Sequence, residues 1–161
     1  MKVLQYGVIA TLQLSLMLID IIINTASEHF RSSELHLLVM YIVQDVSLVL
    51  ALIILFLVFF NTYVFKAGLV ALLIRKFVAT IVVTLIYLAL CLALHVWAMK
   101  LRWGKDKTFY IWDAGKDGYL ILYVCQRAGS VLYYFFYKRT TLRLGDPNYY
   151  KDSAWLREHV N

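Results

Sequence analysis

Four long runs of apolar residues dominate this chain and restrict the folds open to it. They cover about residues 4–26, 35–60, 77–99 and 117–137, and the single proline lies outside all four. About 20 apolar residues in a helix are enough to cross the hydrocarbon core of a bilayer. A spanning segment must satisfy its own backbone N–H and C=O groups, which favours helices. The sequence therefore predicts an all-α fold, a bundle of four transmembrane helices with short loops.

Composition supports one membrane domain over residues 1–161. The chain is 62% hydrophobic, whereas soluble domains are typically about 45–50% apolar. The stretch 61–76 is apolar but contains Lys66 and is short for a fifth span. We expect it to extend the second helix beyond the membrane or to lie in the headgroup layer. After the fourth span, residues 138–143 can continue the helix until Gly145 ends it, within a polar tail over 138–161.

Charge predicts the orientation. Four spans place both termini on one side, together with the second loop. That side carries nine basic residues and the opposite side six, so the positive-inside rule predicts cytoplasmic termini and a cytoplasmic tail. The net charge is +6, and the basic residues lie almost entirely outside the spans. This distribution favours contact with anionic lipid headgroups over nucleic-acid binding.

Arg127 is the residue inside a predicted span whose transfer into the bilayer costs the most free energy. A guanidinium stays charged, and its cost at the bilayer centre is at least about 2.5–3.5 kcal/mol. Asp45 lies near the centre of its span, as Arg127 does, whereas Asp20 lies about five residues outward of its own centre. Depth therefore predicts an intramembrane pair between Asp45 and Arg127, with Asp20 as an added or competing partner. A partner on a neighbouring protein remains an alternative.

Other polar residues form stripes at helical spacing, which predicts seams that face each other or a partner protein. The stripes comprise Gln13, Asp20 and Asn24; Gln44 and Asp45; Thr80, Thr84, Tyr87, Cys91 and His95; and Arg127, Ser130 and Tyr134.

The sequence shows none of the common catalytic or nucleotide-binding motifs. No HExxH, GxSxG, P-loop or GxGxxG motif is present, so we expect no enzyme and no cofactor. His95 has no second His or Cys at metal-ligand spacing, which favours a packed or interfacial histidine over a metal site. Cys91 and Cys125 both fall in apolar segments and are expected to be buried free thiols.

Several longer strings resemble the transmembrane protein 138 family, whose members are small four-span membrane proteins of cilia. The resemblance covers nearly the whole length and is densest in FFNTYVFKAGLV (59–70), LHVWAMKLRW (94–103), and the region 126–157, which includes RLGDP (143–147). Gln44-Asp45 also fits the family pattern.

The resemblance implies a non-enzymatic role in cilium assembly and in delivery or retention of ciliary membrane proteins. It places the chain at the transition zone or ciliary membrane and on vesicles bound for it. Other membrane proteins, such as a rhodopsin-type receptor, are the implied partners. A small proton-coupled transporter using Asp20, Asp45 and Arg127 is the alternative. The candidate partner contacts are Gln44, Gln126, His95, Trp97, Lys138, Arg139, Arg143 and Trp155.

Overall fold

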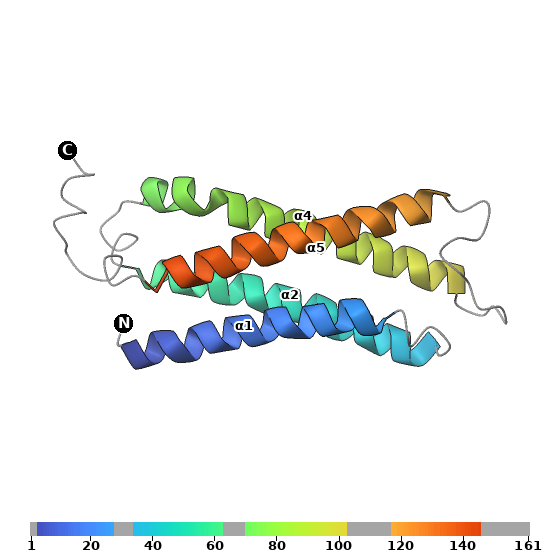
Figure 1. Cartoon of the computed structure of the whole chain (residues 1–161), viewed down its shortest axis with the longest axis horizontal. Helices are drawn as coiled ribbons and strands as arrows, with labels where there is room; N and C mark the ends of the chain where they lie inside the picture. Colours follow the sequence, from blue (N-terminus) through green and yellow to red (C-terminus); the bar gives the residue numbers. More distant parts are fainter. Residues whose placement is uncertain (1–2, 28–33, 63–69, 103–116, 146–161) are drawn as a thin grey trace.

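The computed structural model describes residues 3–27, 34–62, 70–102 and 117–145, and the side chains of most of them. These residues form four helices: α1 (Val3–Ala26), α2 (Glu34–Phe60), α4 (Val70–Arg102) and α5 (Asp117–Arg143). The all-α prediction is confirmed within these ranges. Consecutive helices run in opposite directions, so the start of α1 and the end of α5 lie at the same end of the bundle (Figure 1).

The helices form a closed ring in which α1 and α2, α2 and α4, α4 and α5, and α5 and α1 are neighbours. The α4–α5 pair packs most closely, and the α5–α1 pair least closely. Figure 1 shows α1 and α5 in front, with α2 and α4 behind them. The ring therefore has two opposite seams, one between α2 and α4 and the other between α5 and α1.

Three described stretches are long and apolar enough to cross a membrane: Gly7–Ala26, Leu35–Phe60 and Phe77–Leu101. They correspond to the first three predicted spans. The fourth predicted span coincides with α5 but is not among them. Its tyrosines, Gln126 and Arg127 make it less hydrophobic than the other three helices.

Of the two alternatives for 61–76, the extension of the second helix is not observed in the described residues, and the placement in the headgroup layer stays a prediction. Helix α2 ends at Phe60, where the Thr62 hydroxyl donates a hydrogen bond of 2.7 Å to the Phe59 carbonyl oxygen. Residues 70–76 belong instead to α4, which is one turn or more longer than the predicted span at its start. The part between them, 63–69, lies outside the described residues, as do 103–116 and 146–161.

The end of α5 follows the prediction. The helix continues past the predicted span to Arg143, and the Gly145 backbone N–H then donates to the Leu142 carbonyl oxygen at 3.2 Å in a turn. Glycine is common just past the C-terminal end of a helix.

Aromatic and aliphatic side chains fill the interior on both sides of a polar middle layer. Tyr87 of α4 stacks on Tyr133 of α5 at 5.0 Å between ring centroids. The Tyr137 hydroxyl donates a hydrogen bond of 2.9 Å to the Ala51 carbonyl oxygen, which ties α5 to the diagonally opposite α2. Such contacts hold the helices in a fixed rotation, which positions the polar side chains described next.

Candidate functional site

The Asp20 carboxyl group is the centre of a buried hydrogen-bond network. It accepts hydrogen bonds from Gln44 Nε2 at 2.7 Å, Tyr87 Oη at 2.9 Å and Tyr134 Oη at 2.5 Å. Asn24 Nδ2, one turn along α1, approaches it at 3.2 Å. Asp20 is fully buried, so these donors replace the water that a carboxyl group would otherwise bind.

Asn24 and Gln126 extend the network. Gln126 Nε2 donates to Asn24 Oδ1 at 3.0 Å, and Gln44 Nε2 approaches the same oxygen at 3.1 Å. Asn24 Nδ2 also lies 2.7 Å from Tyr87 Oη and 2.9 Å from Tyr134 Oη. We call Asp20, Asn24, Gln44, Tyr87, Gln126 and Tyr134 the central polar network. All four helices contribute to it, and it contains at least one member of each polar stripe in the sequence.

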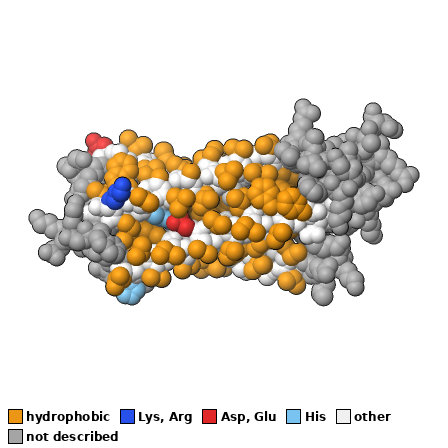
Figure 2. Space-filling model, turned by 180° about the vertical axis from the view of Figure 1, so that it is seen from behind, with side chains coloured by type: hydrophobic (Ala, Val, Ile, Leu, Met, Phe, Trp, Pro, Cys, Tyr) orange, Lys and Arg blue, Asp and Glu red, His pale blue; other side chains and the backbone are white. Residues whose placement is uncertain are grey.

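Asp45 has a different partner at the α2–α4 seam. His95 Nδ1 lies 3.1 Å from Asp45 Oδ2 and 3.0 Å from Oδ1. The Tyr41 ring, one turn earlier on α2, stacks on the His95 ring at 4.0 Å between centroids. The Asp45 side chain is 23% exposed and that of His95 is 7% exposed. The pair therefore borders the outer surface. Figure 2 shows acidic and histidine side chains together within a largely hydrophobic face.

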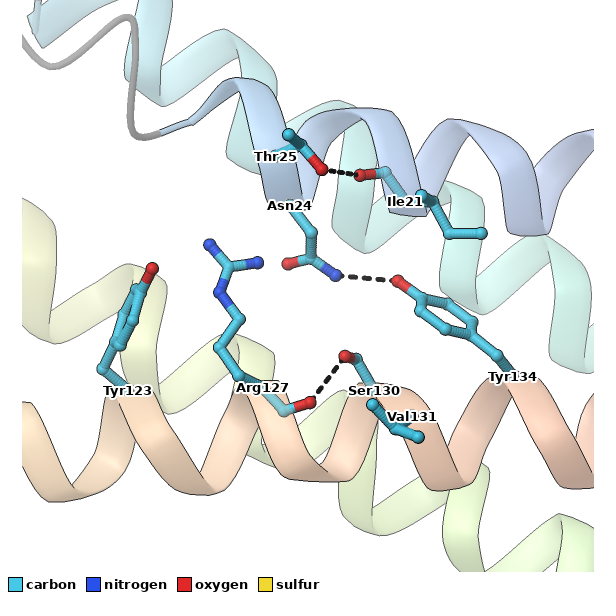
Figure 3. Close-up of a pocket in the computed structure, with 8 residues that line it drawn as sticks. All are labelled: Ile21, Asn24, Thr25, Tyr123, Arg127, Ser130, Val131 and Tyr134. Carbon is cyan, nitrogen blue, oxygen red and sulfur yellow. Dashed lines mark hydrogen bonds between the residues drawn. The ribbon is translucent and has the colours of Figure 1, made fainter.

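Arg127 lies at the opposite seam, between α5 and α1. Its guanidinium carbon is 4.9 Å from the centroid of the Tyr123 ring, a cation–π contact one turn earlier on α5. Figure 3 shows the side chain reaching from α5 toward α1 at Asn24 and Thr25. An open groove of about 480 Å³ surrounds it. We call this the α1–α5 groove, lined by Ile21, Asn24, Thr25, Tyr123, Arg127, Ser130, Val131 and Tyr134.

The predicted pair between Asp45 and Arg127 is corrected by this arrangement, because Asp45 pairs with His95 instead. Successive helical residues point about 100° apart. Gln44 and Gln126 occupy the interior, which turns their neighbours Asp45 and Arg127 out to two seams on opposite sides of the ring. Equal depth along the helices is therefore not sufficient for contact.

Asp20 enters the interior rather than pairing with Arg127 in the described residues. Asp20 and Asn24 lie late in α1 but contact residues near the middle of α2 and α5. Helix α1 is therefore displaced along the bundle axis relative to α2 and α5. The position of Asp20 within its own span gave the wrong level relative to the other helices. Depth could not have shown this, because the displacement depends on how the four helices pack.

The candidate partner contacts separate into buried and exposed groups. Gln44 and Gln126 are 1% exposed and belong to the interior network, so surface contact is the wrong assignment for both. His95 is buried against Asp45. Trp97 is 42% exposed and lies 6.3 Å from the Tyr119 ring, edge to face. Lys138, Arg139 and Arg143 are exposed near the end of α5, whereas Trp155 lies outside the described residues.

The sequence did not indicate that His95 is the partner of Asp45, and the prediction was wrong for one of the two cysteines. Asp45 pairs with His95, which stacks on Tyr41, and the spacing of Tyr41 four residues before Asp45 was the available signal. Cys91 is buried and receives a contact of 3.4 Å from Gln126 Nε2. Cys125 is free, as predicted, but it is exposed rather than buried.

The chemistry of these groups is hydrogen bonding and electrostatic pairing. Among the described residues, no three His, Cys, Asp or Glu side chains are grouped so that they could hold a metal ion. The described helices thus define a multi-span helical membrane protein with an internal polar network and two polar sites on opposite seams.

Comparison with known proteins assigns the family. The model of the family described as Transmembrane protein 138 matches residues 37–159. Proteins named Transmembrane protein 138 are 47% identical to this chain in Mus musculus, 46% in Xenopus tropicalis and 44% in Danio rerio. Each alignment covers 153 residues, which is 95% of this chain and 92% of the relative. No solved structure matches. The chain belongs to the transmembrane protein 138 family, as the sequence resemblance indicated.

Proposed function

We propose that this chain is a non-enzymatic four-span accessory protein that binds polytopic proteins laterally in the ciliary membrane. It would support cilium assembly and the delivery or retention of ciliary membrane proteins. The Asp45–His95 pair, whose Asp45 side chain is partly exposed at the α2–α4 seam, is the observation that carries the proposal. The ciliary setting rests on the family resemblance described above.

In this proposal, α5 is the fourth transmembrane helix. Its polar side chains Gln126 and Ser130 are buried, while its outward face carries large apolar side chains. The exposed members of that face are Leu120, Ile121, Val124, Val131, Leu132, Phe135 and Leu142. A helix with this pattern, set antiparallel against three apolar helices, suits a bilayer better than water. This arrangement of α5 supports a fourth span, and the distribution of basic residues supports cytoplasmic termini.

The Asp45–His95 pair supports lateral binding because polar groups that face lipid are costly. Asp45 lies within the apolar stretch Leu35–Phe60 and is partly exposed. Asp45 Oδ1 is within 3.0 Å of His95 Nδ1 but has no partner with hydrogen-bond geometry among the described residues. Because Oδ1 is buried, a donor on a neighbouring transmembrane helix would reach the partly exposed carboxyl group at Oδ2, which can accept a second hydrogen bond beside that from His95.

Co-purification with a rhodopsin-type receptor from ciliated cells tests the proposal. The tagged full chain should retain the receptor and localise to the cilium. The Asp45→Leu/His95→Leu double variant removes the polar pair without leaving either partner alone, and it should lose the receptor. Ser15→Leu changes an exposed residue of α1 and serves as the control. Recovery only as a lone monomer, with cilia unaffected by loss of the protein, would reject the scaffold function.

A proton-coupled transporter is the second candidate, and the α1–α5 groove is the observation that favours it. The groove reaches Tyr134, whose hydroxyl contacts Asp20. Transport would require a path beyond Asp20, which is fully buried, whereas Asp45 lies on the other side of the ring. Proton uptake into proteoliposomes that is lost on Asp20→Asn would favour this candidate over the scaffold.

A further inference from the structure

Asp20 and Asp45 are the two aspartates inside the described apolar stretches, and they differ in the donors that surround them. Asp20 receives hydrogen bonds from side chains on α2, α4 and α5 and is fully buried. Asp45 receives one in the part of the chain that the structure describes: His95 Nδ1 lies 3.1 Å from Oδ2 and 3.0 Å from Oδ1. A carboxylate offers about four lone-pair sites for hydrogen bonds. Asp45 therefore keeps acceptor capacity that Asp20 has largely used.

The Asp45 carboxyl group is reached from the side of the bundle that faces the bilayer. Its side chain is 23% exposed, and Oδ1 is buried, so an outside group would approach at Oδ2. Asp45 lies ten residues into the apolar stretch that begins at Leu35, about 15 Å along the helix axis. Figure 2 shows acidic and histidine side chains together, surrounded by hydrophobic ones. Irregular backbone exposed to lipid does not occur at membrane depth. A segment that covers Asp45 from the lipid side is therefore a transmembrane helix.

The Asp45–His95 pair carries a negative charge that a partner can neutralise. A neutral imidazole has one N–H, and His95 uses it when it donates from Nδ1 to Asp45. The carboxylate charge then stays on the pair. Ionisable side chains inside membranes pair with one another, and hydrogen bonds that involve ionised groups are about twice as strong as those between neutral groups. A cationic side chain is thus the complement of this site.

The single accessible oxygen favours lysine over arginine. A guanidinium makes its strongest contact with a carboxylate through two N–H groups on two oxygens. Oδ1 of Asp45 is buried and lies 3.0 Å from His95 Nδ1, so half of that contact is blocked. An ammonium group can bind one oxygen without this requirement. We propose that Asp45 binds a lysine in the middle of a partner's transmembrane helix, which packs along the α2–α4 seam.

The surface around Asp45 defines the rest of the partner helix. Residues three and four positions apart on a helix share a face. Such positions beside Asp45 and His95 are exposed and apolar, namely Ile42, Val49 and Leu92. The His95 ring stacks on the Tyr41 ring at 4.0 Å between centroids, which fixes the imidazole against the carboxyl group. The partner helix is therefore apolar apart from its lysine. This inference rests on the lateral binding at the Asp45–His95 pair proposed above.

Synthetic transmembrane helices test the site with the full chain in phosphatidylcholine vesicles. Each probe is a leucine- and alanine-rich helix of about 20 residues with one central lysine, arginine, glutamine or leucine. Energy transfer between a dye on the probe and a dye at the C-terminus of the chain measures association. The lysine probe should bind about tenfold more tightly than the leucine probe. It should also bind more tightly than the arginine and glutamine probes.

Two matched substitutions locate the binding. Asp45→Asn keeps the shape of the side chain and one oxygen but removes the charge, so it should lower the affinity for the lysine probe to that for the glutamine probe. Asp20→Asn makes the same change at the fully buried aspartate and should leave the lysine preference intact. Both variants should keep the helical circular dichroism of the wild type. The comparison of probes on the wild type does not depend on the folding of any variant.

Equal binding of the lysine and leucine probes, or tighter binding of the arginine or glutamine probe, would overturn the inference. A lysine preference that survives in Asp45→Asn would also overturn it, because another group would then bind the probe. A glutamine preference without a lysine preference would leave lateral binding through a neutral donor in place. Retention of the receptor by the Asp45→Leu/His95→Leu variant, together with a lysine preference of the wild type, would reject the proposed function alone.

Discussion

Replacement of Asp20 by leucine tests whether the central polar network stabilises the bundle. The substitution keeps a side chain of similar size but removes both carboxyl oxygens. Gln44 Nε2 and the hydroxyls of Tyr87 and Tyr134 then lose an acceptor at 2.5–2.9 Å. Gln44 and Tyr87 are almost completely buried, so water cannot replace that acceptor. The bundle should become less stable although the chain becomes more apolar.

The magnitude follows from the number of donors. Hydrogen bonds inside membranes average about 0.6 kcal/mol each and reach about 1.7 kcal/mol. Three bonds give about 2 kcal/mol at the average and about 5 kcal/mol at the upper value. Tyr134 borders the groove and can turn its hydroxyl outward. We therefore expect Asp20→Leu to lower the free energy of unfolding by about 2–4 kcal/mol.

Equilibrium unfolding in mixed micelles measures this loss. The protein is titrated with sodium dodecyl sulfate, and tryptophan fluorescence and circular dichroism follow the transition. Asp20→Asn retains an acceptor oxygen and should lose less stability than Asp20→Leu. Ser15→Leu makes a polar-to-apolar change on the exposed face of the same helix and should be close to neutral. If Asp20→Leu unfolded at the same detergent fraction as the wild type, the network would not stabilise the fold and the reasoning would be refuted.

Three further changes can be measured in the same titration. A Cβ at Gly129 would lie 3.3 Å from a leucine of α4, so Gly129→Leu should lower the free energy of unfolding by about 1–3 kcal/mol through overpacking. Gly7→Ala has open space around it and should lower it little. Equal effects of the two substitutions would disprove the close approach of α4 and α5. Removing Asp45 or His95 alone should destabilise more than replacing both by leucine, because each single change leaves one polar group in an apolar setting; additive losses would argue against the pair. Tyr137→Phe removes a bond of 2.9 Å between α5 and α2 and should cost about 0.6–1.7 kcal/mol; an unchanged transition would show that this bond contributes nothing measurable.

The course of each helix was largely predictable because it depends on neighbouring residues. Apolar length indicated the segments that became α1, α2, α4 and α5, and the glycine at position 145 indicated the end of the last one. The start of α4 was not predicted. Lys66 and the short length of 61–76 suggested a separate segment, but residues 70–76 join the helix that follows.

Depth alone gave the wrong ion pair because a pair also requires two helices to face each other. Sequence position estimates how far a residue lies along its own helix. It does not give the displacement of that helix relative to its neighbours or its rotation within the ring. Both quantities arise from side-chain packing among segments far apart in the chain, such as the stacking of Tyr87 on Tyr133.

The sequence by itself determined that this chain forms apolar helices, that their polar residues gather on stripes, and that it belongs with the transmembrane protein 138 proteins. Only the tertiary structure decided which polar groups meet. It placed Asp20 at the centre of four helices, set Asp45 against His95 on one seam, and turned Arg127 into a groove on the other. The physical reason is that one helical step turns a side chain by about 100°, so a glutamine that packs inward directs its charged neighbour to the outer seam.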